Sequence, residues 1–196
     1  MLAGGRGSRM GGTTPKPLIS LAGRPLIAYV LDRLAPVLKP VLVGTHPDRG
    51  FEALNLPLVP DRLAGFAGPL AGLDAAVAWL RENEPKVSGL ICTPGDTPFL
   101  PFDLVERMLD GPRDEVRSAR FSGLLQPSVT YWPLARLDDL AAYLEETPDR
   151  SIRSFLARSG VQPVDFLPSD HAPHGDSFFN VNTHEDLAKA TAFLAG

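Results

Sequence analysis

Residues 2–16 read Leu2-Ala-Gly-Gly-Arg-Gly-Ser-Arg-Met-Gly-Gly-Thr-Thr-Pro-Lys16, and this stretch decides how the rest of the sequence is interpreted. It contains five glycines, and glycine lets the backbone adopt positive φ angles and approach a ligand closely. Successive backbone N–H groups in such a segment can converge on the oxygens of an anion. Arg9 and Lys16 add positive charge that suits a polyphosphate. The stretch therefore predicts a phosphate-binding loop.

This loop belongs to neither of the two commonest phosphate-loop motifs. No Gly-Lys-Ser/Thr follows it, which excludes a Walker A loop, and Gly5-Arg-Gly-Ser-Arg-Met lacks the third glycine of the dinucleotide fingerprint. A flexible glycine-rich terminus is the alternative, and the embedded Arg9 and Lys16 argue against it. A phosphate loop usually follows a buried strand, but only residues 1–3 precede the first glycine. Without that strand, the backbone N–H and C=O groups of the neighbouring strands would lack hydrogen-bond partners. We therefore expect the numbered chain to begin inside it.

Beyond the loop, short apolar runs alternate with amphipathic stretches, a pattern typical of α/β domains. We predict a three-layer α/β/α fold with a mainly parallel, twisted sheet. Helices are expected from Pro25 and at residues 70–80, 104–109, 137–144, 152–156 and after 183. Strands are expected at residues 40–44, 57–60, 87–93, 117–132 and 161–166. Because there is no internal repeat and no long linker, residues 1–196 are expected to form a single domain.

Asp96 stands out because it follows the apolar run 87–93 within Thr93-Pro-Gly-Asp-Thr-Pro. Ligands bind open α/β sheets at the carboxyl ends of the strands. Mg²⁺ needs only a few carboxylates beside phosphate oxygens and water, so a single aspartate suits it. Alternatively, Asp96 caps the turn before Thr97. The residues alone leave both roles open.

Composition narrows the class of protein. A net charge of −4 gives no electrostatic reason to expect nucleic acid or an anionic membrane as partner. No apolar run approaches the ~20 residues that span a bilayer, and no secretory signal is evident, so we expect a cytoplasmic protein. The single cysteine, Cys92, excludes an internal disulfide and is expected to be a buried apolar residue. His171 and His174 lack a convincing third ligand and are expected in solvent.

The opening Leu-Ala-Gly-Gly, with its arginine and downstream lysine, resembles the nucleotidyltransferase superfamily. The chain is more closely similar to the molybdenum cofactor guanylyltransferases, which join GMP to molybdopterin. Four further stretches carry this resemblance in the family's order, at residues 60–73, 93–104, 126–133 and 178–187. Together they span nearly the whole chain. The resemblance implies a nucleotide-diphospho-sugar transferase-like fold, with the nucleotide bound by the N-terminal half and the acceptor by the C-terminal half.

The resemblance also implies a nucleotide site. Lys16 matches the family's phosphate lysine, Asp61 a nucleotide-contacting aspartate, and Asp96 the aspartate that holds Mg²⁺. The paired glycines favour GTP over CTP, because related cytidylyltransferases usually read Ala-Ala-Gly there. The backbone positions that match guanine and phosphate contacts are Leu2, Ala3 and Gly4, with Gly5 completing the glycine pair.

Two positions depart from the family's pattern. Thr13-Thr-Pro-Lys-Pro-Leu is closer to the sugar-phosphate nucleotidyltransferases and about one residue longer than usual. His46 stands where the family often has an asparagine near the base, and a histidine can donate or accept a hydrogen bond there.

Asn180 and Asn182 match the acceptor-binding region. They flank Val181, so on a strand their side chains would share a face. Their alternative role is turn and cap chemistry before the last helix, for which Thr183 and Asp186 form a capping pair.

These assignments imply transfer of GMP from GTP to the terminal phosphate of molybdopterin. That phosphate is already anionic at neutral pH, so positioning and charge neutralisation by Mg²⁺, Arg9, Lys16 and the loop amides are expected to suffice. A sugar-1-phosphate or cytidylyl-type nucleotidyltransferase is the nearest alternative, and a non-catalytic nucleotide-binding module is another. We expect a monomer with transient contacts to other cofactor-biosynthesis proteins.

Overall fold

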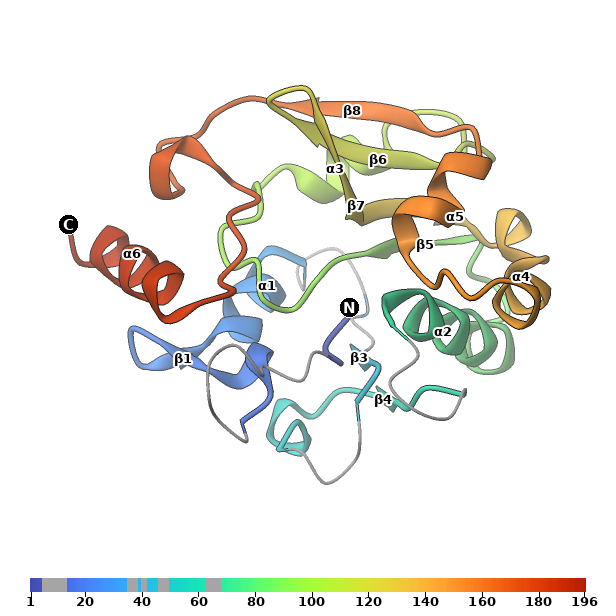
Figure 1. Ribbon diagram of the computed structural model, residues 1–196, viewed down its shortest axis with the longest axis horizontal. Helices are drawn as coiled ribbons and strands as arrows, with labels where there is room; N and C mark the ends of the chain where they lie inside the picture. The colour runs from blue at the N-terminus through green and yellow to red at the C-terminus, as the bar shows by residue number, and fades with distance from the viewer. Residues whose placement is uncertain (5–13, 35–38, 40–41, 46–49, 63–67) are drawn as a thin grey trace.

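The computed structural model describes residues 1–4, 14–34, 39, 42–45, 50–62 and 68–196 (Figure 1). The expected helices are confirmed, although the first begins one residue later than predicted, because Pro25 ends a short strand instead. The α-helices are α1 (Leu26–Leu34), α2 (Pro69–Asn83), α3 (Leu104–Leu109), α4 (Leu140–Glu146), α5 (Ile152–Arg158) and α6 (His184–Ala195). The 3₁₀ turns are η2 (Lys16–Leu18), η4 (Glu52–Leu54), η5 (Leu134–Leu137) and η6 (Pro173–Gly175).

The described strands form one larger sheet and two strand pairs. They are β1 (Ser20–Leu21), β2 (Arg24–Pro25), β3 (Leu42–Val43), β4 (Leu58–Val59), β5 (Gly89–Cys92), β6 (Arg117–Phe121), β7 (Leu124–Pro133) and β8 (Gln162–Phe166). The larger sheet has the order β5-β7-β6-β8. β1 and β2 pair antiparallel, whereas β3 and β4 pair in parallel.

The α/β class is confirmed, and the larger sheet is mixed, with three of its four strands running in the same direction. β7 runs antiparallel to both β5 and β6, while β6 and β8 are parallel. The reason lies in the two residues between β6 and β7. Ser122 and Gly123 have φ angles of 48° and 79°. Two consecutive residues at positive φ make a tight hairpin turn, which joins only antiparallel strands.

Helices cover both faces of the larger sheet, as the three-layer prediction required. Neighbouring residues of a strand point to opposite faces. Trp132 of β7 packs in one apolar cluster with residues of α2, α4 and α5, such as Phe155. Its neighbour Tyr131 packs in a second cluster with residues of α1 and α3, such as Met108. The strands β5, β6 and β7 therefore form a central layer between two layers of helices.

The N-terminal residues lie between the ends of β3 and β5. The Leu2 N–H donates to the Thr93 carbonyl at 2.7 Å, and the Gly95 N–H donates to the Leu2 carbonyl at 2.8 Å, in a parallel bridge. On the other side, Gly4 lies so close to Gly44 that a Cβ at Gly4 would stand 2.5 Å from the Gly44 carbonyl oxygen. The start of the chain is thus fixed at the carboxyl ends of two strands.

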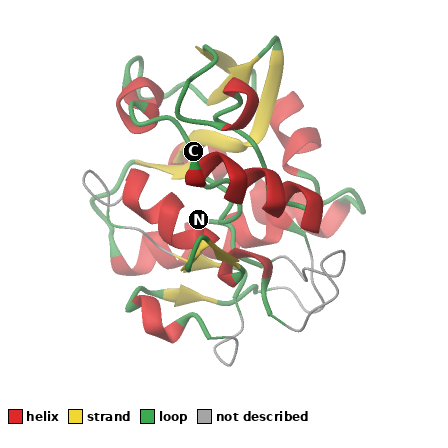
Figure 2. Cartoon of the chain, turned by 90° about the vertical axis from the view of Figure 1, so that its left-hand side faces the viewer, coloured by secondary structure: helices red, strands yellow, loops and turns green. Residues whose placement is uncertain are grey.

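A third apolar cluster attaches the C-terminal segment to this same edge. Phe99, in the loop after β5, packs edge-on against Phe193 of α6, with ring centroids 5.5 Å apart. Val181 and Ala190 are fully buried in the same cluster, together with Leu26 of α1. Figure 2 shows α6 on the face of the molecule turned toward the viewer. This packing places residues 180–182 beside the loop after β5.

Candidate functional site

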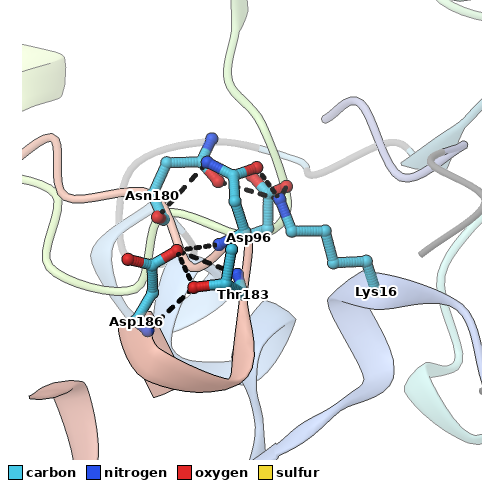
Figure 3. Close-up of polar contacts among 6 residues, drawn as sticks. Lys16, Asp96, Asn180, Thr183 and Asp186 are labelled. Atoms are coloured by element: carbon cyan, nitrogen blue, oxygen red, sulfur yellow. Dashed lines mark hydrogen bonds and ion pairs between the residues drawn. The ribbon is translucent and has the colours of Figure 1, made fainter. Parts of the chain in front are cut away.

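Lys16 is the centre of a polar cluster at this edge of the structure. It is the first residue of η2, and only 9% of its surface is exposed. Its ammonium lies 2.5 Å from Asp96 Oδ2 and donates to Asn180 Oδ1 at 2.9 Å and to Asn182 Oδ1 at 2.5 Å (Figure 3). An ammonium has three donors, so these three oxygens match its full capacity. The sequence predictions for all four residues therefore meet at one point.

Asp96 is held in the loop after β5 by packing on both sides. A Cβ at Gly95 would stand 3.2 Å from the Pro17 ring and 3.3 Å from the Leu2 carbonyl oxygen, so this loop fits closely against both segments. The Asp96 carbonyl accepts a hydrogen bond from the Val181 N–H at 3.1 Å. Asp96 Oδ1 is buried and has no hydrogen-bond partner among the described residues. The carboxylate therefore faces Lys16 and does not cap the turn at Thr97.

Asn180 and Asn182 do not lie on a strand, yet both direct their amide oxygens to Lys16 because Val181 between them is buried. The end of this segment is fixed by the predicted capping box of α6. The Asp186 carboxylate accepts from the Asn182 N–H at 3.0 Å and the Thr183 N–H at 2.8 Å. The backbone of Asn182 thus takes part in the cap, while its side chain reaches Lys16.

The pKa of Asp186 reflects this role. Partial burial of the carboxylate acts to raise its pKa, but the hydrogen bonds from Thr183 and Asn182 outweigh that effect, and the pKa lies below its ordinary value. The ionised carboxylate is therefore the form that the cap stabilises.

A second group of predicted residues lies at the other end of the N-terminal segment. Ala3 is buried, whereas Gly4 is exposed beside Gly44. A Cβ at Gly44 would stand 3.5 Å from Asp61 Oδ1, so the Asp61 carboxylate adjoins this pair of glycines. Because Leu2 also bridges to the loop of Asp96, residues 2–4 connect the Asp61 group with the Lys16 group.

Some predicted site residues cannot be placed. Gly5, Arg9 and His46 lie outside the described residues. Two features were not predicted from the sequence. The first is the pair of hydrogen bonds from Lys16 to Asn180 and Asn182, which are 164 and 166 positions away in the chain. The second is the close approach of Gly4 to Gly44. The glycine ending the apolar run 40–43 was the available signal for the second feature.

Among the described residues, no group of three or more His, Cys, Asp or Glu side chains is arranged to hold a metal ion. The isolated Cys92 is buried as expected, and burial raises the pKa of its thiol to about 11. In the part of the chain that is described, no helix is long and apolar enough to cross a membrane.

Comparison with known families decides the assignment. The model of the MobA-like NTP transferase domain matches residues 1–164, which include Lys16, Asp61 and Asp96. The chain belongs to this family.

Relatives match over the full length of the chain. A molybdenum cofactor guanylyltransferase of Bradyrhizobium sp. (strain ORS 278) is 38% identical over 100% of this chain and 92% of its own. The protein of the same name from Rhizobium meliloti (strain 1021) is 36% identical over 99% and 90%. The chain is therefore a nucleotidyltransferase of the molybdenum cofactor guanylyltransferase type.

Solved structures agree on the fold. Molybdopterin-guanine dinucleotide biosynthesis protein A from Archaeoglobus fulgidus superposes with a TM-score of 0.75 at 24% identity, covering 99% of this chain and 96% of its own. A 4-diphosphocytidyl-2C-methyl-D-erythritol synthase from Anaerococcus prevotii gives a TM-score of 0.70 at 15% identity, covering 100% and 96%. At these identities the similarity concerns the fold alone.

Proposed function

We propose that this protein transfers GMP from GTP to the terminal phosphate of molybdopterin and releases pyrophosphate. The names of the full-length relatives support the reaction class and both substrates. The observation that carries the proposal is the convergence of Lys16, Asp96, Asn180 and Asn182 at the carboxyl end of β5. Positive charge, one carboxylate and two amides are suited to placing phosphates rather than to acid–base chemistry.

The reaction requires one bond to form and one to break. A terminal phosphate oxygen of molybdopterin attacks the α-phosphorus of GTP, and the bond from that phosphorus to the bridging oxygen of the β-phosphate breaks. Lys16 is suited to neutralise charge on the triphosphate, because it directly follows the glycine-rich segment in the sequence and its ammonium lies beside the loop after β5. The backbone of Leu2, Ala3 and Gly4 and the carboxylate of Asp61 adjoin one another, in support of a nucleotide site there.

The residues present fit a magnesium ion, which we include in the proposal. Mg²⁺ prefers oxygen ligands and is often bound through one or two carboxylates. Asp96 offers a carboxylate with a buried oxygen that lacks a partner among the described residues. When bound there, Mg²⁺ would offset the negative charge of the phosphates. Asp96 is the residue we expect to hold it.

Several finer assignments remain predictions. Arg9 and Gly5 are expected at the phosphates and His46 near the base. Asn180 and Asn182 are expected in the acceptor-binding region. The preference for GTP rests on the Gly4-Gly5 pair, and the monomeric state and cytoplasmic location likewise remain predictions.

The proposal is tested by measuring pyrophosphate release with each of GTP, CTP, UTP and ATP, in the presence and absence of molybdopterin and Mg²⁺. We expect release only when GTP, molybdopterin and the metal are combined. Release with CTP in preference to GTP would overturn the guanylyl assignment. Release with a sugar phosphate instead of molybdopterin would overturn the acceptor.

A further inference from the structure

Asp74 of α2 is a buried carboxylate that takes no part in the polar cluster around Lys16. In the described part of the chain, three charged side chains are buried, namely Lys16, Asp74 and Arg117. Arg117 donates hydrogen bonds to the backbone carbonyls of Met108 and Pro112 around the end of α3. Burial of a carboxylate is unfavourable unless it is paired, so Asp74 needs a partner as well.

The partner of Asp74 is Arg62, which directly follows the predicted nucleotide residue Asp61. Arg62 Nη1 lies 3.4 Å from Asp74 Oδ2. The Asp74 side chain is only 10% exposed, whereas that of Arg62 is 57% exposed. Departure of the guanidinium would leave a buried carboxylate without this counter-charge, which is strongly unfavourable. The ion pair therefore holds residue 62 against α2.

This ion pair restrains the backbone around Asp61 from one side, and β4 restrains it from the other. The Val59 carbonyl accepts a hydrogen bond from the Gly44 N–H at 3.0 Å. Pro60, the next residue, has a ring that fixes its φ angle. Arg62 then attaches the residue after Asp61 to α2. The Asp61 carboxylate, which adjoins Gly44, is thus carried by a short segment that is fixed at both ends.

The helix that carries Asp74 also supports the other parts of the predicted nucleotide site. Ala75 and Ala76 of α2 pack in one apolar cluster with Val59 of β4 and with Leu2. Figure 1 shows α2 beside β3 and β4, which it contacts. Loss of the ion pair would therefore free Asp61 to move relative to residues 2–4, which stay packed on α2.

We propose that Asp74 is a positioning residue of the nucleotide site, which acts through Arg62 to hold Asp61 in the orientation that contacts the nucleotide. It acts without touching the nucleotide, as residues that orient a binding side chain from behind do. The inference rests on the proposed function for the role of Asp61. It adds Arg62 and Asp74 to the residues that determine nucleotide affinity.

The test compares nucleotide affinity with stability in Asp74→Ala. Alanine is a good helix former, and the released Arg62 is already more than half exposed to water, so the melting temperature should change little. Calorimetry should nevertheless show GTP binding about tenfold weaker than in the wild type, which lies within the range of coupling between contacting residues. The KM for GTP in the pyrophosphate-release assay should rise by the same factor. The kcat at saturating GTP should stay near the wild-type value, because only uniform binding is lost.

Asp138→Ala is the matched control for Asp74→Ala. Asp138 also pairs with an arginine, Arg81 of α2, but both of these side chains are exposed. The control should leave GTP affinity unchanged.

A double-mutant cycle tests whether Asp74 acts through Arg62. Arg62→Met should weaken GTP binding about as much as Asp74→Ala, and the variant with both substitutions should bind no more weakly than either. Arg62→Lys keeps the positive charge and should bind GTP more tightly than Arg62→Met. Thermal melting verifies that each variant is folded, and Arg62→Gln replaces Arg62→Met if the latter does not fold.

Wild-type GTP affinity in Asp74→Ala would show that the ion pair is only structural, and would overturn the proposal. Losses that multiply in the double variant would also overturn it, because the two residues would then act separately. Binding is measured with GTP, CTP, UTP and ATP. A wild-type preference for another nucleotide would count against the guanylyl assignment alone, and the variants are then compared with that nucleotide. A wild type that binds none of the four would overturn both proposals.

Discussion

Replacing Asp96 by asparagine should separate folding from turnover. The substitution keeps the size of the side chain but removes the charge that lies 2.5 Å from the Lys16 ammonium. A hydrogen bond to a charged group contributes about 1.5–3 kcal/mol, and Lys16 keeps its two asparagine partners, so we expect the loss to be near the lower bound, about 1.5 kcal/mol. For a chain of this size, about 2–4 °C per kcal/mol gives a melting temperature lower by about 3–6 °C.

Turnover should fall far more steeply than stability in this variant. The charge that develops on the leaving pyrophosphate loses its stabilisation, which typically costs about 100-fold or more in rate. Pyrophosphate release at saturating GTP and molybdopterin measures this loss.

Asp165→Asn is the matched control for Asp96→Asn. It removes an exposed carboxylate that makes two hydrogen bonds of 2.6 Å to Arg120 on the neighbouring strand, and it should leave turnover unchanged. A lowered melting temperature with wild-type turnover in Asp96→Asn would show that Asp96 is only structural, and would refute the reasoning.

Three further predictions follow from the geometry. Gly4→Ala should weaken GTP binding in calorimetry by about 1–3 kcal/mol, because its Cβ would overlap the Gly44 carbonyl oxygen at 2.5 Å and push the segment aside. Gly123→Ala is the control, because its Cβ would meet no atom within 4 Å, and it should leave GTP affinity unchanged. Equal GTP affinities in the two variants would contradict this prediction. Hydrogen bonds hold the pKa of Asp186 below its ordinary value of 3.8, despite the opposing effect of burial. The ionised cap therefore stabilises the fold above pH 3.8, and this stabilisation is lost as the pH falls through the pKa that Asp186 has in the folded protein. The difference in urea-unfolding free energy between wild type and Asp186→Asn should accordingly narrow in acid, and a constant difference would count against the cap. Cys92, with a thiol pKa of about 11, should resist alkylation at neutral pH until the protein is unfolded; rapid labelling of the native protein, followed by mass spectrometry, would show that it is accessible.

Local rules predicted most of the helices but did not predict the reversed direction of β7. The start of α6 could be read from Thr183 and Asp186, because a capping box involves only neighbouring residues. Strand direction depends on how strands are connected. The short turn at Ser122-Gly123 was a readable hairpin signal, but the α/β alternation of the whole chain favoured parallel pairing.

The site shows the same division between local and tertiary information. The position of Asp96 just after a buried strand could be predicted from the apolar run that precedes it, and Lys16 could be singled out because it ends a glycine-rich segment. That Lys16 bonds to both Asn180 and Asn182 could not be predicted, since only the packing of the Phe99 loop against α6 brings these segments together. A single sequence contains no periodicity that reports such a contact.

The most direct test of the account is to identify the product by mass spectrometry. The protein is incubated with Mg²⁺, molybdopterin and an equimolar mixture of GTP and CTP, and pyrophosphate is quantified in the same sample. The account predicts a molybdopterin–GMP adduct joined through a diphosphate, with one pyrophosphate per adduct formed. A molybdopterin–CMP adduct as the main product, or nucleotide consumption without any adduct, would contradict it.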